Sequence, residues 1–500
     1  MSHRKNIQPY SSIDLLNTFI NKFQCGSQLA KSDDANFLLR YSTDNFYNFI
    51  SGFYIYGGYP WEKSDEPSLL FSYPESSIIA SKFSSFCLPY GLNHTRVRCD
   101  LLSSAYDQSQ IDDSEFFTLY FPENSEAPYL FCLKFNANPL TMPTICHTFT
   151  IFQLLEHCNV YNMPYCEFCI AIQSKYPNSQ LFSKFLKWIL ISEMTSRLQI
   201  SNVLESFYSG DLITNIIIWP ESHHNSFLDC LNSFFYRNTP QECEKILIDK
   251  KPYPIFEWVA PRCLNSYYPM ASRCLGNIIK FLDIDNFWKL FSSMLLERSI
   301  IIYHPKPEVV CDAIISLHFL IKPLVWACST ISILPPSLSD LLNIPNPIIM
   351  GTSMAIDEIN CGWIFVDMKK NSVFTDEDII LHPKKDKFLA DFSKKYTDIS
   401  NSCKPDSSST IEILEACNSY VKEIVELLNK SIISDFSDPL NVQSKFYEEM
   451  YLQFFDINER DFLHHFCTSQ MVMLHIEQLC RKSSDYKKIE TSSPLCFSPQ

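Results

Sequence analysis

Cysteine pairs are the first feature of this chain that could do chemistry, because paired thiolates bind zinc. Cys166 and Cys169 have the C-x-x-C spacing of a structural zinc site. Such a site needs a second, comparably spaced pair of ligands, and only His157-Cys158 lies nearby in sequence. We therefore expect no metal here, and expect Cys166 and Cys169 to be packed within a helix.

Histidine and glycine motifs do not indicate an enzyme either. His223-His224 and His464-His465 do not follow the H-E-x-x-H pattern of zinc proteases, so we expect solvated or packed side chains. Nine glycines in 500 residues leave few places where the backbone could approach a phosphate. The motifs G-x-G-x-x-G and G-x-S-x-G do not occur. The glycine spacing of a P-loop occurs once, but Gly58 stands where a P-loop has its lysine. We expect no cofactor and no covalent chemistry.

A charged pair, Glu297-Arg298, directly precedes an apolar run. Upstream, apolar residues recur at three- and four-residue steps over 284–295, which predicts a helix. Downstream, Ser299–Tyr303 contains three consecutive isoleucines, which predicts a strand covered on both faces. We expect Glu297 and Arg298 to orient the helix-to-strand turn through local hydrogen bonds or an ion pair, rather than to contact a partner protein.

The elements that follow alternate between helix and strand. Pro307 suits the first turn of a second helix, because its missing N–H has no partner there. Two further apolar runs, Ser329–Leu334 and Pro347–Met350, lie on either side of Pro335-Pro336 and a short helical piece. This alternation predicts a parallel sheet with right-handed crossovers, and thus an α/β fold.

This block resembles the central module of the DENN family, whose members exchange nucleotide on Rab GTPases. Two runs carry the resemblance: LLERSIIIY, with Glu297 and Arg298, and ILPPSLSDLLNIPNPIIMG, with Pro335 and Pro336. Other segments resemble the flanking modules and the start of the central one, namely PSLLFSYPE (67–75), FCLPYG (86–91), the strands at 116–121 and 129–135, the segment 168–190, and the segments 363–383 and 462–479.

The resemblance implies an α/β protein of two lobes, an N-terminal longin-like lobe and a C-terminal doubly wound lobe with trailing helices. We expect five regions, which are an extension at 1–45 with an amphipathic helix at 12–23, a uDENN-like module at 46–165, a cDENN-like module at 166–355, a dDENN-like module at 356–480, and a disordered tail at 481–500. Local patterns add a strand at 213–218 and helices at about 411–430, 440–456 and 459–479.

The same resemblance implies a guanine-nucleotide exchange factor for a Rab-type small GTPase in membrane trafficking. Exchange needs a binding surface rather than a nucleophile or a metal. We expect GTPase contacts on connectors that reach a cleft, and the candidates are Tyr90, Asn93, Asp340, Asn343, Pro345 and Asn346.

A second hypothesis is a GTPase-activating protein or a non-exchanging adaptor of the folliculin-like branch. Stimulated hydrolysis usually requires an arginine delivered to the γ-phosphate. In that branch the arginine comes from the longin-like lobe, and the hairpin loop at 122–128 has none. Arg96 and Arg98 remain as sources, so the sequence leaves this alternative open.

Composition indicates where the protein works. The net charge of −15 argues against nucleic acid as the main partner. The first residues lack the apolar core of a signal peptide, and the longest apolar stretch, 314–334, is interrupted by Lys322-Pro323. We expect no transmembrane segment, reduced cysteines, and a cytoplasmic protein that associates peripherally with vesicle or endosomal membranes.

Overall fold

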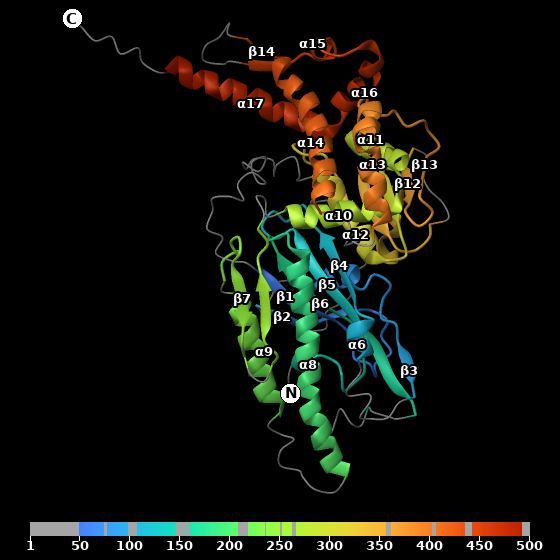
Figure 1. Cartoon of the computed structure of the whole chain (residues 1–500), viewed down its shortest axis with the longest axis vertical. Helices are drawn as coiled ribbons and strands as arrows, with labels where there is room; N and C mark the ends of the chain where they lie inside the picture. Colours follow the sequence, from blue (N-terminus) through green and yellow to red (C-terminus); the bar gives the residue numbers. More distant parts are fainter. Residues whose placement is uncertain are drawn as a thin grey trace, which may run out of the picture. The chain divides into compact units, whose positions relative to one another are not determined.

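Among the residues that the computed structural model describes, two large β-sheets organise the fold, one in each of two units (Figure 1). The first unit holds the described residues up to Met270 together with Ser332–Asp340, and the second holds Ala271–Ile331 and the described residues from Leu341 onward. The structure describes residues 50–74, 78–98, 108–146, 157, 161–208, 219–235, 237–250, 253–262, 267–356, 362–402, 407–435 and 443–492. The helix expected at 12–23 and the strand expected at 213–218 lie outside these residues.

The sheet of the first unit is antiparallel throughout. Its central strand, β6 (Met163–Ser174), pairs with a neighbour on each side and with β3 near its own beginning. The strand order is β2 (Ser68–Tyr73), β1 (Gly52–Gly57), β6, β5 (Tyr129–Ala137) and β4 (Glu115–Tyr120), with β3 (Thr95–Val97) joined to β6. The strands predicted at 116–121 and 129–135 are confirmed as β4 and β5.

Different elements cover the two faces of this sheet. On one face, Phe131 of β5 stacks on Phe182 of α8 (Ser179–Tyr208) with ring centroids 4.4 Å apart. Phe53 of β1 meets Phe227 of α9 (Trp219–Phe235) on the same face. On the opposite face, the Tyr56 hydroxyl donates to the Ala80 carbonyl of α3 (Ile78–Ser81), which α4 (Ser84–Cys87) follows. The remaining short elements are α6 (Ser109–Asp112), η3 (Thr144–Cys146), β7 (Lys245–Ile248) and β8 (Phe256–Val259).

Cys166 and Cys169 lie in β6, so the helix predicted around them is wrong. Every residue from Cys166 to Ser174 is buried, because β6 is a central strand with both faces covered. Such a strand has a continuous apolar run, which periodicity alone cannot separate from a buried helix. Residues three apart in a strand point to opposite faces, so Cys166 and Cys169 cannot chelate one ion together.

The sheet of the second unit is parallel except at one edge. Its order is β10 (Ser329–Ile331), β11 (Ile348–Thr352), β9 (Ile300–Tyr303), β12 (Ile364–Asp367) and β13 (Ser372–Phe374). The first four strands are parallel, as the sequence predicted for three of them, and β13 is antiparallel to β12. Because β12 pairs with β9, the sheet continues across the module boundary expected after residue 355.

Two predicted helices flank strand β9. The first, α11 (Ile284–Leu295), begins at Asp283, whose carboxylate accepts the Asn286 N–H at 2.8 Å. The second, α12 (Pro307–Leu320), has proline in its first turn, as predicted. The unit also contains α10 (Tyr268–Phe281), η4 (Pro336–Asn343, shared with the first unit), α13 (Lys385–Asn401), α14 (Ser407–Lys430), β14 (Ile432–Asp435), β15 (Gln443–Phe446), α15 (Glu448–Leu452), α16 (Ile457–Thr468) and α17 (Gln470–Ser492).

The C-terminal helices differ from the prediction in two places. The helix expected at 440–456 is a strand followed by the short helix α15, since β15 pairs with β14. The helix expected at 459–479 is broken at Ser469, which has an extended backbone (φ −66°, ψ 142°), and α17 then continues past Arg481 to Ser492. Across the residues described, we find no helix with both the length and the apolar character needed to cross a membrane.

Two histidines lie in the core of the second unit as neutral rings. His318 Nε2 lies 3.2 Å from the Thr330 hydroxyl, and His382 Nδ1 accepts the Lys384 N–H at 3.1 Å. Burial, together with the smaller effect of a nearby lysine charge, lowers the pKa of each imidazole to about 3. The folded state therefore binds fewer protons at these side chains than the unfolded chain does below pH 6.5.

We predict that this unit loses stability as the pH falls from 6.5 towards 3. Each histidine should reduce the free energy of unfolding by about 1.4 kcal/mol per pH unit in that window, because only the unfolded chain takes up the proton. Urea unfolding at pH 7, 6 and 5 measures the slope. The double variant His318→Gln/His382→Gln should show a flatter slope than the wild type. Identical slopes for the two proteins would contradict this assignment.

Candidate functional site

Glu297 is a buried carboxylate that caps a helix far away in sequence. It lies in the turn between α11 and β9, with 6% of its surface exposed and a left-handed backbone (φ 54°). Its Oε1 accepts the Met471 N–H at 3.1 Å, and its Oε2 accepts the Gln470 N–H. These two N–H groups begin α17, so Glu297 supplies the acceptors that a helix N-terminus lacks.

The surroundings of Glu297 explain why a charged group is tolerated there. Burial raises the pKa of its carboxyl group, and the hydrogen bonds from Gln470 and Met471 partly offset that rise. The positive end of the α17 dipole also favours the ionised form. The Cys328 thiol adds a weak hydrogen bond to Oε1 at 3.6 Å.

Arg298 ties the same turn to a different segment. Its guanidinium donates to the Gly362 carbonyl at 3.0 Å and forms an ion pair with Glu377. The expected ion pair therefore exists, and the backbone N–H groups of Glu297 and Arg298 bond locally, to Met294 and Ser293. The side-chain partners, in contrast, all lie far away in sequence. The sequence could not show this, because both sets of partners lie in segments that only the fold brings to the turn.

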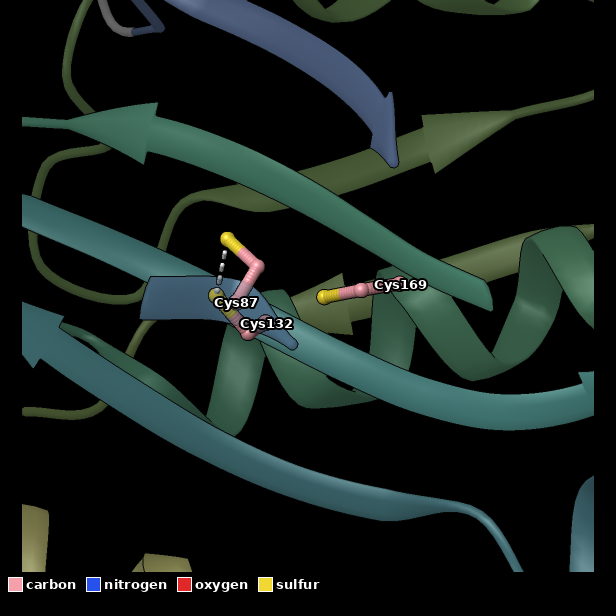
Figure 2. Close-up of side chains that lie close together, drawn as sticks. All are labelled: Cys87, Cys132 and Cys169. Carbon is pink, nitrogen blue, oxygen red and sulfur yellow. Dashed lines mark hydrogen bonds between the residues drawn. The ribbon is translucent and has the colours of Figure 1, made fainter. Parts of the chain in front are cut away.

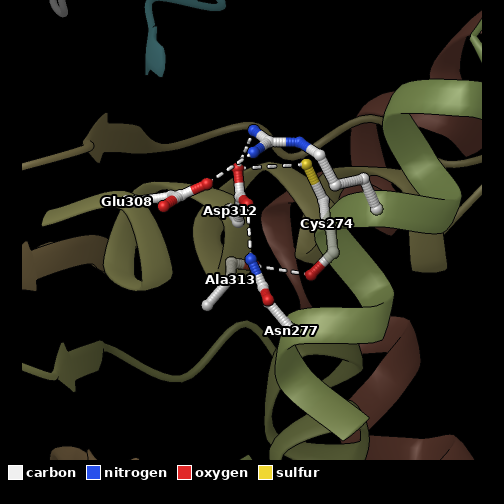
Figure 3. A network of polar contacts seen from close by, with 7 residues as sticks. Cys274, Asn277, Glu308, Asp312 and Ala313 are labelled. Atoms are coloured by element: carbon white, nitrogen blue, oxygen red, sulfur yellow. Dashed lines mark hydrogen bonds and ion pairs between the residues drawn. The ribbon is translucent and has the colours of Figure 1, made fainter. Parts of the chain in front are cut away.

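A second buried carboxylate, Asp312, joins α10 to α12 (Figure 3). Its Oδ1 accepts from Arg273 Nη2 at 2.6 Å, and its Oδ2 accepts from Asn277 Nδ2 at 2.6 Å. Arg273 also donates to the carboxylate of Glu308 at 2.8 Å. Burial raises the pKa of Asp312 to about 6, while the charge of Arg273 opposes the rise. Sequence reasoning missed this network, since one acidic residue inside an apolar helix gave no distinctive pattern.

Ligands of parallel α/β sheets bind beyond the carboxyl ends of the strands. In the second unit, the buried polar groups at those ends hold their own loops. The Lys306 N–H donates to His304 Nδ1 at 3.1 Å, after β9. The Met354 N–H donates to the Thr352 hydroxyl at 3.1 Å, and the Lys370 N–H donates to Asp367 Oδ1 at 3.0 Å. These contacts define the loop shapes at this edge.

The residues nominated from the sequence for partner contact are all exposed. Tyr90 and Asn93 lie after α4, and the Asn93 N–H donates to Glu167 Oε2 at 3.4 Å. These two residues and Asp340 belong to the first unit. The other three nominated residues, Asn343, Pro345 and Asn346, belong to the second unit.

The double proline shapes the segment that carries Asp340. Pro335 is buried and its carbonyl accepts the Leu338 N–H at 2.9 Å, whereas Pro336 is exposed and begins η4. Just before the prolines, the Ser332 hydroxyl accepts the Tyr120 N–H of β4 at 2.8 Å. The motif Pro335-Pro336 therefore fixes a turn on the first unit.

The arginines of the alternative hypothesis lie at β3. Arg96 is exposed on this short strand. The guanidinium of Arg98 lies over the Tyr161 ring, 5.2 Å from its centroid. This contact occupies the flat face of Arg98 with a neighbouring ring.

Comparison with known proteins gives one family. Residues 165–376 match the family model described as "DENN (AEX-3) domain". The DENN domain and WD repeat-containing protein SCD1 of Arabidopsis thaliana is 34% identical over 114 residues, which are 22% of this chain and 10% of that protein. DENN domain-containing protein 1B of Homo sapiens is 24% identical over 239 residues, 46% of this chain and 29% of that protein. The chain thus spans less than a third of the length of each relative.

We predict that the Glu297 carboxylate stabilises α17. Glu297→Ala should cost about 2 kcal/mol, because it removes a cap and leaves buried N–H groups without acceptors. Glu297→Gly also removes the carboxylate but suits the positive φ, so it should cost about 1 kcal/mol less than the alanine variant. Urea unfolding measures both free-energy losses. Hydrogen exchange at the Gln470 and Met471 N–H groups should be faster in both variants than in the wild type.

Glu377→Gln provides the matched control, since it changes an exposed carboxylate that pairs with the neighbouring Arg298. Its effect should stay below about 1 kcal/mol. Unchanged exchange at Gln470 and Met471 in Glu297→Ala would show that Glu297 does not cap α17.

We predict that Arg273→Met destabilises the second unit in a pH-dependent way. At pH 8 the variant leaves the Asp312 carboxylate buried without its cation, at a cost of about 3 kcal/mol. The folded pKa of Asp312 is already raised, and losing Arg273 raises it further, so the penalty fades as the pH falls and Asp312 is protonated. Thermal unfolding at pH 8 and pH 5 tests this, with Glu308→Gln as the partly exposed control. An equal loss at both pH values would exclude Asp312 as the cause.

Proposed function

We propose that this chain, which matches the DENN domain model over residues 165–376, promotes GDP release from a Rab-type small GTPase. Proteins with this domain are generally Rab exchange factors. The match is the observation that carries the proposal, and it spans the whole sheet of the second unit, from β9 to β13. We further propose that the first unit is the longin-like lobe and that the helices after β13 form the third module.

Nucleotide exchange is a problem of binding rather than of bond chemistry. A GTPase holds GDP through its phosphate loop, Mg²⁺ and ordered switch segments. A partner that binds the displaced switch segments more tightly than the closed ones lowers the affinity for GDP by linkage. The protein must therefore offer a stable surface with exposed anchoring side chains, and it regulates the GTPase without forming a covalent bond.

The loop around η4 is our proposed contact segment in the second half of the chain. Asp340, Asn343 and Asn346 present polar side chains to solvent, and Pro345 limits the conformations of the loop between them. The turn fixed by Pro335 and the hydrogen bond between Ser332 and Tyr120 hold the beginning of this segment. A segment held in this way loses little entropy on binding. Tyr90 and Asn93 are the proposed contacts from the first unit.

The proposed cellular role is regulation of vesicle traffic. The protein would act in the cytoplasm at the surface of vesicle or endosomal membranes, where Rab GTPases are bound. In this proposal, the parallel sheet and the capped C-terminal helices form the rigid framework of the second unit. The exposed loops on that framework supply specificity for one GTPase.

The decisive experiment measures release of a fluorescent GDP analogue from a panel of Rab GTPases, with and without the full chain. We expect acceleration for one or two of them. The triple variant Asp340→Ala/Asn343→Ala/Asn346→Ala should slow that exchange by about tenfold, as expected when interface anchors are lost. Lys422→Ala/Glu426→Ala, an exposed pair on α14, is the matched control and should exchange at the normal rate.

Parallel assays distinguish the alternatives. Faster GTP hydrolysis without faster GDP release would contradict exchange and identify a GTPase-activating protein, with Arg96 as the first residue to replace. Stable binding with neither effect would identify an adaptor. A triple variant as active as the wild type would exclude the η4 loop from the contact surface.

A further inference from the structure

Three cysteines far apart in sequence meet inside the first unit (Figure 2). Cys87 ends α4, Cys132 lies in β5 and Cys169 lies in β6. All three are 0% exposed, and their Sγ atoms lie within 4.8 Å of one another. The Cys87 and Cys132 sulfurs are 3.7 Å apart, which is the distance of a weak hydrogen bond between two thiols.

Strand register explains why these cysteines share one face. Cys169 lies directly opposite Lys134 of β5, and Cys132 is two residues before Lys134 on the same face. The helix α4 covers that face and adds Cys87. Cys166 is also 0% exposed, but it lies three residues before Cys169 and so points to the opposite face. The C-x-x-C spacing thus hid the grouping, because only one of its two cysteines takes part.

The geometry matches that of a three-sulfur metal site. An ion at the centre of three sulfurs at about 2.3 Å would place them about 4.0 Å apart. The observed separations, 3.7 Å between Cys87 and Cys132 and at most 4.8 Å for the other pairs, lie on either side of this value. Among the described residues, the histidines, cysteines and carboxylates near this point offer only these three ligand atoms. Structural zinc almost always takes four ligands, whereas thiolates alone suit Cu(I).

A positive charge lies close to the group. Lys134 lies directly opposite Cys169 and is held there by ion pairs with Glu115 at 2.9 Å and Glu167 at 3.4 Å. A cation beside sulfur ligands favours their ionised form, which is the form that binds a metal ion.

We propose that Cys87, Cys132 and Cys169 form a binding site for a soft monovalent metal ion, Cu(I), in the core of the first unit. Cu(I) binds two thiolates and the third sulfur as a neutral thiol. Binding to the fully protonated group therefore releases two protons, and no electron is transferred. The complex of one Cu(I), two thiolates and one thiol carries one negative charge. This site is independent of the proposed exchange activity.

The test is copper retention by the full chain. The protein is produced in cells supplied with copper, because the buried site fills most readily during folding, and is purified without oxygen or added thiols. We expect about one copper per chain by elemental analysis, an ultraviolet sulfur-to-copper absorption band, and an X-ray absorption spectrum of copper with sulfur neighbours only. Cells supplied with zinc instead give the comparison, and we expect no zinc to remain bound.

Variants locate the ion. Cys169→Ala and Cys87→Ala should each weaken retention by more than about tenfold. Cys166→Ala is the matched control, since it is equally buried on the same strand and should retain copper. Circular dichroism verifies folding, and Cys87→Ala, at the end of a short helix, serves if Cys169→Ala does not fold.

Three outcomes would overturn the proposal. They are a wild-type chain without copper, a Cys169→Ala chain with as much copper as the wild type, and a chain that retains zinc but not copper.

Discussion

The hydrogen bonds from the first turn of α17 to Glu297 are the contact on which the second unit most depends. A helix N-terminus has N–H groups without intrahelical acceptors, and burying them unpaired costs free energy. Ser469 cannot continue α16, because its backbone is extended there, so α17 must begin anew inside the protein. The acceptor comes from the turn before the first parallel strand, β9. This contact ties the turn before the central strand to the start of the last helix.

The backbone at Glu297 shows how strongly this contact is specified. A left-handed conformation is unfavourable for a residue with a Cβ atom, and glycine would be the ordinary choice. Glutamate is present instead, so the capping hydrogen bonds must outweigh that cost. Arg298 acts on the same turn from the other direction, through Gly362 and Glu377. Two consecutive residues thus connect β9 to two segments that lie far downstream.

The sequence predicted those parts of the fold in which local pattern and tertiary environment agree. The helix α11 and the strand β9 were predictable because one has a 3.6-residue apolar period and the other is a short isoleucine run. Strand β6 was mistaken for a helix because burial on both faces removes the alternation that marks a strand. The break at Ser469 was missed because its cause, the cap from Glu297, lies far away in sequence.

The candidate site was less predictable than the fold, for a related reason. Asp340 and Asn346 could be nominated because prolines and polar residues between apolar runs indicate exposed connectors. The partners of Glu297 and Asp312 could not be nominated, because they depend on which helices pack together. Periodicity identifies the face of an element that is buried, but it does not identify the element that covers it.

The cysteine group of the first unit illustrates how a site can be present without a signature in the sequence. A thiol packs as a small apolar group with only a weak hydrogen-bonding capacity, so three of them in a core cost little when no ion is bound. The metal-free protein can therefore fold, unlike a zinc finger, whose folding depends on its ion. Stability measurements alone would not distinguish a metal site from ordinary packing here. Only the convergence of three sulfurs from α4, β5 and β6 separates the two, and that convergence follows from strand register.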